Sequence, residues 1–206
     1  MKVLILGASG KTGSAVVERA LAKGHEVTVL VRDSRKFTKS GVEVLTGDAT
    51  KRGDVVRAMK GQDAVIESIG GTTPYKATSL ETASVQNIIH AMQQGGARRL
   101  VVVSMMGIGE SRDQAPFWYR YLLMPTFLHG STKDKTRMEE EVMKSGLSYV
   151  IARPPILTDE PATGTIRVIG KGMTGHSISR ADLANFLVDQ LEDDSNLGRA
   201  VTVVNK

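Results

Sequence analysis

The stretch that decides the fold is KVLILGASGKTG, residues 2–13, and an apolar-periodic segment follows it. Its first part, Lys2–Leu6, is a short aliphatic run without alternation, which is typical of a strand buried on both faces. Gly7, Gly10 and Gly13 then stand three residues apart, as a dinucleotide-binding turn requires for a tight bend, close approach to a pyrophosphate and close helix packing. A helix beginning near Gly10 would point free N–H groups at that phosphate. The stretch therefore predicts a nucleotide-binding strand–turn–helix unit.

Glycines also form ordinary turns, so a purely structural turn is the alternative to a nucleotide site. The position of these glycines between a strand and a helix favours the nucleotide. We expect the following turn residues to contact the cofactor: Gly7, Ser9, Gly10, Lys11, Thr12 and Gly13.

The composition limits the fold and the partners. With 206 residues, 41% of them apolar, the chain can bury one core, and we expect a single domain over residues 1–206. The net charge is +5, but basic residues are mixed with acids and aromatics make up only 4%, which favours anionic small molecules over nucleic acid. There is no cysteine, and no apolar run reaches membrane-spanning length. We expect a cytoplasmic protein without a metal site, either a monomer or a homodimer.

The second predicted strand, residues 25–31, ends in a basic cluster that bears on the form of the cofactor. An acid at this strand tip would hold a ribose 2′-hydroxyl, whereas an arginine accommodates a 2′-phosphate. Arg32 takes the tip, with Arg35 and Lys36 close behind, so NADP(H) is favoured over NAD(H). Asp33 next to the tip leaves the use of NAD(H) open, and a solvated basic loop is the alternative.

The alternation of strands and helices predicts an α/β domain, a doubly wound parallel sheet with helices on both faces. Further strands are expected at residues 42–46, 64–69, 99–103, 147–152, 165–169 and 200–204. Helices are expected at residues 54–59, 80–94 and 131–144, the last with capping residues in 131–134. The final helix opens with Ser179-Arg180-Ala181-Asp182, which has the pattern of a capping box.

In an open α/β sheet, ligands bind at the carboxyl ends of the strands, near the point where the strand order reverses. The ends of the third and fourth strands therefore supply cofactor candidates. Asp48, followed by Ala49, could accept from an adenine amino group or, alternatively, cap a helix. The fourth strand ends in Ser68, Ile69 and Gly70, where glycine lets the backbone pass close to a ligand.

Ser104 follows the fifth strand and would face the nicotinamide end of a dinucleotide; a hydroxyl that only satisfies the strand end is the alternative. Pro154 and Pro155 cannot continue a central strand, so we expect a loop there at the ligand edge. Two segments are expected to shape a substrate pocket, residues 109–130 and about 153–178. The first holds most of the aromatic residues and is consistent with a core helix, a pocket lid or a dimer patch.

Seven motifs together resemble the atypical short-chain dehydrogenase/reductase superfamily, in its small NAD(P)H-binding, NmrA-like branch. They lie at residues 7–13 (GASGKTG), 29–33 (VLVRD), 47–48 (GD), 61–66 (GQDAVI), 145–149 (SGLSY), 153–155 (RPP) and 178–183 (ISRADL). Within this branch the chain is most similar to the biliverdin reductase B group of NADPH-dependent flavin reductases. The resemblance implies a Rossmann-like fold that holds NADP at the glycine turn and at the basic tip of the second strand.

The resemblance also implies a reaction, in which hydride passes from nicotinamide C4 to a planar acceptor, a flavin or a linear tetrapyrrole, stacked over it. FMN or FAD would then be a substrate rather than a tightly bound group. Ser104 would lie near the nicotinamide, and Pro154, Pro155 and Ile156 would border the cofactor and the pocket. Ile156 stands where the biliverdin reductase B pattern has a histidine, which makes a tetrapyrrole substrate less favoured.

The wider superfamily uses a Tyr-x-x-x-Lys motif as proton donor and ribose holder. The matching residues here are Ser131 and Lys135, so the lysine is present and the tyrosine is absent. Lys135 is a candidate to hold the ribose, with a solvated helix residue as the alternative. Without the tyrosine, alcohol–ketone chemistry lacks its proton donor, whereas hydride transfer to flavin N5 requires less from the protein.

Three functions follow, in order of preference. The first is NAD(P)H-dependent reduction of free flavins or similar planar acceptors, with Ser104 and Lys135 as candidate catalytic residues. The second is a redox sensor of the NmrA-like type, which binds NAD(P) without turnover. The third is a sugar-nucleotide epimerase or dehydratase, which the missing tyrosine disfavours.

Overall fold

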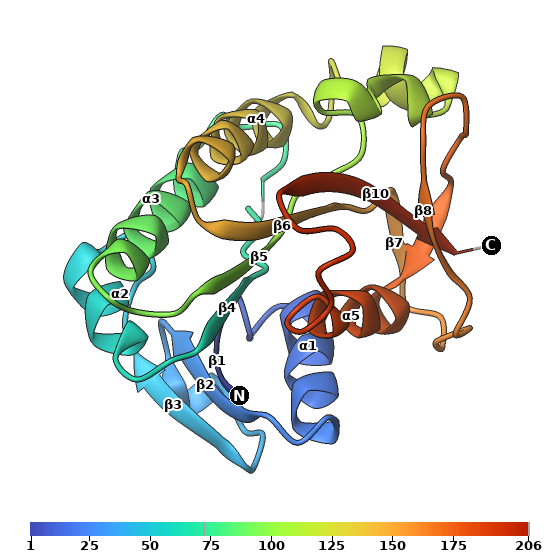
Figure 1. The fold of residues 1–206 in the computed structure, drawn as a ribbon. Coiled ribbons are helices and arrows are strands. Elements are labelled where there is room, and N and C mark those ends of the chain that lie inside the picture. The colour runs from blue at the N-terminus through green and yellow to red at the C-terminus, as the bar shows by residue number, and fades with distance from the viewer. Residues whose placement is uncertain (72, 206) are drawn as a thin grey trace.

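The strands form one mainly parallel sheet in the order β3-β2-β1-β4-β5-β6-β10-β8 (Figure 1). The computed structural model describes residues 1–71 and 73–205, apart from the side chain of Lys36. The strands are β1 (Lys2–Leu6), β2 (Glu26–Val31), β3 (Val42–Thr46), β4 (Ala64–Glu67), β5 (Arg99–Val103), β6 (Ser148–Arg153), β8 (Ile166–Ile169) and β10 (Arg199–Asn205). Helices α2 (Arg52–Met59), α3 (Leu80–Gln93) and α4 (His129–Lys144) cover one face, and α1 (Lys11–Ala22) and α5 (Arg180–Asp189) the other. The predicted doubly wound α/β fold is confirmed.

The first strand lies in the middle of the core because it is apolar on both sides. Val3 and Ile5 pack in the cluster that contains α1 and α5, whereas Leu4 and Leu6 pack in the cluster that contains α2, α3 and α4. All four side chains are fully buried. β4 pairs with β1 on the side opposite to β2, so the strand order reverses between β1 and β4.

The carboxyl-terminal part of the sheet differs from the predicted all-parallel arrangement. β8 pairs with β10 in the antiparallel sense at the edge. The chain leaves the main sheet at Pro154 and Pro155, as predicted, although Arg153 still belongs to β6. Proline has no N–H for a ladder hydrogen bond, so the two prolines separate β6 from β7 (Ile156–Thr158). β7 then pairs with β9 (Ser177–Ser179) in a small parallel sheet.

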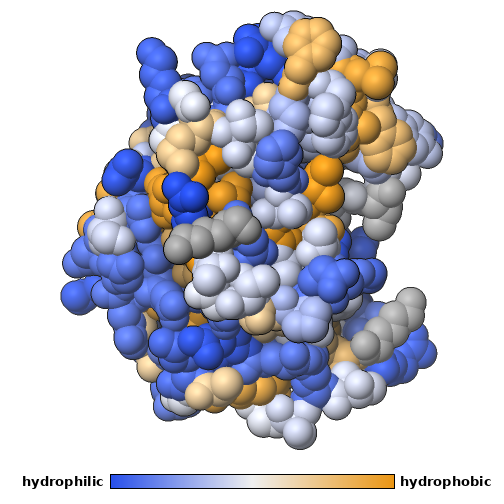
Figure 2. Space-filling view, turned by 90° about the vertical axis from the view of Figure 1, so that its right-hand side faces the viewer, coloured by the Kyte–Doolittle hydropathy of each residue, from blue (hydrophilic) through white to orange (hydrophobic). Residues whose placement is uncertain are grey.

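The aromatic segment at residues 109–130 forms a short 3₁₀ helix, η2 (Gly109–Gln114), and a short π-helix, η3 (Tyr119–Leu123), before α4 begins. Tyr119 is buried in a small apolar cluster of this segment, whereas Phe117 is 78% and Leu122 is 65% exposed. Figure 2 shows apolar side chains along the upper edge of the face drawn, at the height of this segment in Figure 1. The segment is therefore not a core helix, and its role as a pocket lid or dimer surface stays a prediction.

Among the capping residues predicted at 131–134, Asp134 caps a different helix. α4 begins earlier, at His129, and has no side-chain cap. The carboxylate of Asp134 accepts the N–H groups of Glu81 and Thr82, both at 3.1 Å, in the first turn of α3. Asp134 is 1% exposed. It therefore caps α3 from within a neighbouring helix and fixes the two helices to each other.

The capping box predicted at α5 is half formed. Ser179 Oγ accepts the N–H of Asp182 at 3.0 Å, but the Ser179 N–H donates to Asn205 Oδ1 at 2.8 Å instead of to Asp182. The Asp182 carboxylate accepts the N–H groups of Thr163 at 2.8 Å and Gly164 at 3.0 Å. Burial alone would raise the pKa of Asp182, but hydrogen bonds from Thr163, Asn205 and Gly164 outweigh it and hold the pKa below its usual range. Asp182 thus joins the loop before β8 to α5 and β10.

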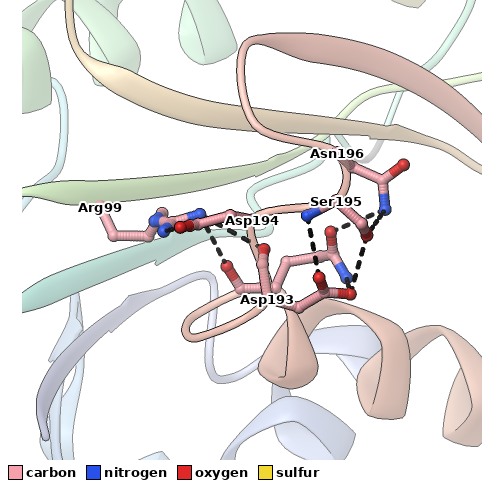
Figure 3. Close-up of polar contacts among 6 residues, drawn as sticks. Arg99, Asp193, Asp194, Ser195 and Asn196 are labelled. Carbon is pink, nitrogen blue, oxygen red and sulfur yellow. Dashed lines mark hydrogen bonds and ion pairs between the residues drawn. The ribbon is translucent and has the colours of Figure 1, made fainter.

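At the amino edge of the sheet, Arg99 of β5 anchors the loop between α5 and β10 (Figure 3). Its guanidinium forms an ion pair with Asp194 and donates to the carbonyl oxygen of Gln190 at 3.4 Å. The neighbouring Asp193 carboxylate accepts the N–H of Ser195 at 2.8 Å. These contacts lie at the edge opposite to the carboxyl ends of the parallel strands, so we regard them as structural.

A cluster of ionisable side chains is buried at the carboxyl end of β4. Glu67 is fully buried, and its Oε1 accepts the N–H of Ile69 at 3.1 Å, where the strand ends two residues earlier than predicted. Burial raises the pKa of Glu67 to about 8, with nearby Lys135 lowering it and Glu81 and Asp134 raising it. Within residues 1–71 and 73–205, Glu67 Oε2 has no hydrogen-bond partner. Glu67 is therefore largely protonated at neutral pH.

We expect Glu67 to make the protein less stable as the pH rises from about 5 to about 8. In this range the native carboxyl keeps its proton, up to a pKa of about 8, whereas the unfolded carboxyl has lost it above its ordinary value of 4.5. The native state thus binds more protons, and the free energy of unfolding should fall by up to about 1.4 kcal/mol per pH unit. Glu67→Gln should remove this part of the slope, measured by urea denaturation across the range.

The matched control is Glu160→Gln, which changes an exposed carboxylate and should leave the slope as in the wild type. Equal slopes in the wild type and Glu67→Gln would contradict the burial of a protonated carboxyl.

Candidate functional site

The three glycines of the turn have different structural roles. Gly7 has φ +84°, and a Cβ there would lie 2.6 Å from the carbonyl carbon of Ser68. A Cβ at Gly13 would lie 2.2 Å from the carbonyl oxygen of Gly7, so α1 can approach β1 only with glycine at this position. Gly10 is exposed, and the nearest atom to its Cβ would be the Gly7 oxygen at 3.3 Å. The fold itself therefore requires Gly7 and Gly13 strictly, whereas a Cβ at Gly10 would meet only the Gly7 oxygen, in a tight contact.

The turn presents the first residues of α1 to solvent. Gly10 is the N-cap of α1 and has no side chain to accept from the first turn. Ser9 and Lys11 are exposed, and Thr12 is half-buried. The first intrahelical bond closes from the Ser14 N–H to the Gly10 oxygen at 2.8 Å. The predicted turn residues thus leave a helix N-terminus open to an anionic group.

The end of β4 lies directly beside this turn. The Ser68 hydroxyl and the Ser68 N–H both donate to the Leu6 carbonyl oxygen at 3.0 Å, which holds β4 against β1. Ser68 and Ile69 are half-buried, and Gly70 is exposed. The structure therefore brings the predicted residues 68–70 together with the glycine turn.

The basic cluster after β2 contains one arginine without an ion pair among the described residues and one arginine that is paired. Arg32 is exposed and forms no ion pair in the part of the chain that the structure describes. Arg35 pairs with Asp33, through Nε to Oδ1 at 2.9 Å and Nη2 to Oδ2 at 3.1 Å. The side chain of Lys36 lies outside the described residues. Among the basic side chains that the structure describes at this tip, Arg32 is thus the one available to bind a ligand.

Asp48 does not cap a helix, which was the alternative to contact with adenine. α2 begins at Arg52, and Asp48 Oδ1 instead accepts the N–H of Thr50 at 2.9 Å and its hydroxyl at 2.8 Å. These two bonds, with a smaller contribution from Arg32, hold the pKa of Asp48 below its usual range. Asp48 and Ala49 are both half-buried. Asp48 is therefore an ionised acceptor close to the tip of β2.

Ser104 and Lys135 meet at the carboxyl end of β5. Lys135 is 9% exposed, and its Nζ donates to the Val103 carbonyl oxygen at 3.0 Å and lies 3.2 Å from Glu81 Oε1. Lys135 is thus buried and is not a solvated helix residue. Ser104 is 3% exposed, and its hydroxyl has no hydrogen-bond partner among the residues described. A buried hydroxyl without a partner is uncommon in a folded protein and points to a role outside the fold's own hydrogen bonds.

The segment after β6 borders the same edge. The Pro154 carbonyl oxygen accepts the N–H of Met106 at 2.9 Å, which joins it to the segment after Ser104. Pro154 and Pro155 are buried, and Ile156 is 42% exposed. The structure therefore places the predicted residues 154–156 beside the end of β5, with an exposed apolar side chain.

An ion-pair bridge across this edge was not predicted. Asp159, in the loop after β7, pairs with Lys11 Nζ at 2.5 Å and with Arg180 Nη1 at 2.5 Å. The hydrogen bond from Lys11, followed by the charge of Arg180, holds the pKa of Asp159 below its usual range. The bridge joins the start of α1 to the segment at residues 153–178. No local pattern in the sequence signals it, because its partners are far apart in the chain.

The described residues fit a dinucleotide better than a metal ion. Such a ligand would use the exposed helix N-terminus at Gly10, the unpaired Arg32 and the unpartnered Ser104 hydroxyl. Within the described ranges, no group of histidine and acidic residues is arranged to hold a metal ion. No helix in the same ranges is long and apolar enough to cross a bilayer.

Comparison with known proteins shows the family to which the chain belongs. A model of an NAD(P)H-binding family matches residues 7–194. An uncharacterised chloroplastic protein of Arabidopsis thaliana is 29% identical over 218 residues, covering 98% of this chain and 76% of that protein. The structure of anaerobilin reductase ChuY from Escherichia coli O157:H7 is similar, with a TM-score of 0.82, 25% identity and coverage of 100% of this chain and 97% of that chain.

A second solved structure, a candidate NADH–flavin reductase from Streptococcus pneumoniae, has a TM-score of 0.76 and 25% identity, with both chains fully covered. The family match extends from the glycine turn through α5, so it includes the predicted site residues from Gly7 to Ile156. A closer relation to the biliverdin reductase B group stays a prediction. The chain belongs to the NAD(P)H-binding family of atypical short-chain dehydrogenases/reductases.

Proposed function

We propose that the protein is a reductase that passes hydride from NADPH to a flavin or a similar planar acceptor. The observation that carries the proposal is the buried, unpartnered Ser104 hydroxyl at the end of β5, next to the segment that Lys135 holds in place. An uncommitted hydroxyl at this point can orient a nicotinamide ring or an acceptor without loss of a hydrogen bond within the protein.

The cofactor would be held by residues that the fold leaves free. The N-terminus of α1 at Gly10 would bind the pyrophosphate, and Arg32 would bind a 2′-phosphate. Asp48 and the backbone at residues 68–70 would border the adenosine and ribose parts. NADPH, when bound, supplies the hydride at nicotinamide C4. Lys135 would act through position, because its ammonium holds the end of β5 through the Val103 carbonyl.

The absence of the superfamily's tyrosine from the site favours a planar acceptor over a ketone. Ser131, where the superfamily motif has its tyrosine, is half-buried, and its N–H donates to the Pro74 carbonyl oxygen at 2.9 Å. Reduction of a ketone needs a proton donor at that point, whereas a reduced flavin can take its proton from water. The similar structures named above, described as an anaerobilin reductase and an NADH–flavin reductase, support a planar conjugated acceptor.

A redox sensor without turnover is the second candidate, and the state of Lys135 favours it. Its ammonium is bound by Val103 and Glu81 inside the fold, which leaves the site without a free lysine as well as without the tyrosine. Such a site could bind NADP(H) and perform no chemistry.

The deciding experiment is the fall of nicotinamide absorbance when the protein meets NADPH, with and without FMN, and again with NADH. FMN-requiring, protein-dependent oxidation that prefers NADPH is expected. Tight NADPH binding without oxidation by FMN or riboflavin would overturn the reductase and favour the sensor.

The free arginine at the tip of β2 allows a matched test of cofactor choice. Arg32→Ala should weaken NADPH binding by about 10- to 100-fold and NADH binding far less, because a charged hydrogen bond to the 2′-phosphate is lost. Arg35→Ala removes a neighbouring charge that is paired with Asp33, so it should have a smaller effect. Titration of cofactor fluorescence measures both. An equal loss for the two cofactors in Arg32→Ala would contradict the assignment.

Two glycines of the turn allow the effect on cofactor binding to be measured separately from the effect on stability. Gly10→Ala should weaken NADPH binding by about tenfold or more while costing only about 1 kcal/mol of stability, since its Cβ would meet the Gly7 oxygen alone, at 3.3 Å. Gly13→Ala should instead destabilise the fold by about 1–3 kcal/mol or more, because its Cβ would overlap the Gly7 carbonyl. Denaturation and cofactor titration of both variants check this. Normal NADPH affinity in Gly10→Ala would mean that the turn is purely structural.

A further inference from the structure

A separate cavity of about 610 Å³ lies between α4 and the segment at residues 107–125. Four α4 residues line it, His129, Thr132, Lys133 and Thr136, and their spacing puts them on one stripe of the helix. Lys135 is buried and is not among the residues that line the cavity. The cavity is therefore distinct from the face that Ser104 and Lys135 share.

The polar wall of this cavity is strongly basic. Arg112 and Lys133 line it, are exposed, and form no ion pair within the residues that the structure describes. Arg120 also lines it and pairs with Asp113, Nη1 to Oδ1, at 2.6 Å, while its buried Nε has no acceptor among the described residues. Three cationic side chains thus line the cavity, and the structure pairs one of them, Arg120, with a carboxylate. Like charges around one cavity repel one another unless an anion enters.

The rest of the wall is apolar or backbone. Ile108 and Met124 line the cavity and are 4% and 9% exposed, and Pro125 adds a flat apolar surface. The chain at Gly107 and Gly109 runs along the same wall without side chains. The volume is within the range of cavities that bind small organic ligands. An apolar floor beneath a cationic rim suits a flat aromatic ring that carries an anionic group.

We propose that this cavity binds an aromatic compound bearing a phosphate or carboxylate, held by Arg112 and Lys133 at the anionic group and by Ile108 and Met124 at the ring. The proposal does not depend on hydride transfer, because neither Ser104 nor Lys135 lines the cavity.

FMN and riboflavin test the proposal, because they share one ring system and differ in the phosphate. Binding is measured by quenching of flavin fluorescence without NADPH and again with saturating NADP⁺. We expect FMN to bind at least about tenfold more tightly than riboflavin, with NADP⁺ leaving FMN binding in place. Equal affinities, or displacement of FMN by NADP⁺, would overturn the proposal.

Charge variants locate the site. The double variant Arg112→Ala/Lys133→Ala should lower FMN affinity to about that of riboflavin and leave riboflavin affinity unchanged. The matched control Arg52→Ala/Lys60→Ala removes two exposed charges at α2 and should bind FMN like the wild type. An equal loss of FMN binding in both double variants would mean that the affinity depends on the net charge of the protein. This result would contradict FMN binding in the proposed cavity. Since no turnover is measured, these outcomes are independent of the reductase assay.

Discussion

The close contact between the start of α1 and the ends of β1 and β4 is the constraint on which the rest of the site depends. A Cβ at Gly13 would lie 2.2 Å from the Gly7 oxygen, and a Cβ at Gly7 would lie 2.6 Å from the Ser68 carbonyl carbon. These three elements can therefore meet only with glycine at both positions. Their meeting brings the open N-terminus of α1 to the reversal of strand order, where open α/β sheets bind their ligands.

Buried charges, together with apolar packing, fix the opposite wall of this edge. Arg153 is 1% exposed and pairs with Glu139 of α4, Nη2 to Oε2, at 2.6 Å. Asp134, also on α4, caps α3, and Lys135 binds the end of β5. Loss of one partner would leave an uncompensated charge in the interior, which is far more costly than loss of a surface pair. α4 is thus locked to α3, β5 and β6, and the position of Ser104 is set by that arrangement.

The sequence predicted what depends on local pattern. The bounds of β1, β3 and β5 agree with the prediction, because Gly7, Gly47 and Ser104 directly follow these three strands. It did not predict which helix Asp134 would cap, because a capping pattern shows a competent acceptor and not its distant donor. Glu67, an acid within an apolar strand, was a visible signal of a buried polar site, but its partners on α3 and α4 come together only in the folded chain.

The two lysines of α4 show why burial, rather than spacing, decides between chemical roles. Lys133 and Lys135 are two residues apart, so a helix turns them about 200° away from each other. Lys135 points inward, and its ammonium is bound by Val103 and Glu81. Lys133 is exposed and lines a cavity. Neither ammonium therefore replaces the missing tyrosine at Ser131 as a free proton donor in the site. A reductase with this site would rely on the reactivity of the bound cofactor and on the positioning of the two reacting rings. A flavin-like acceptor therefore suits the site better than a ketone, which also needs a proton donor.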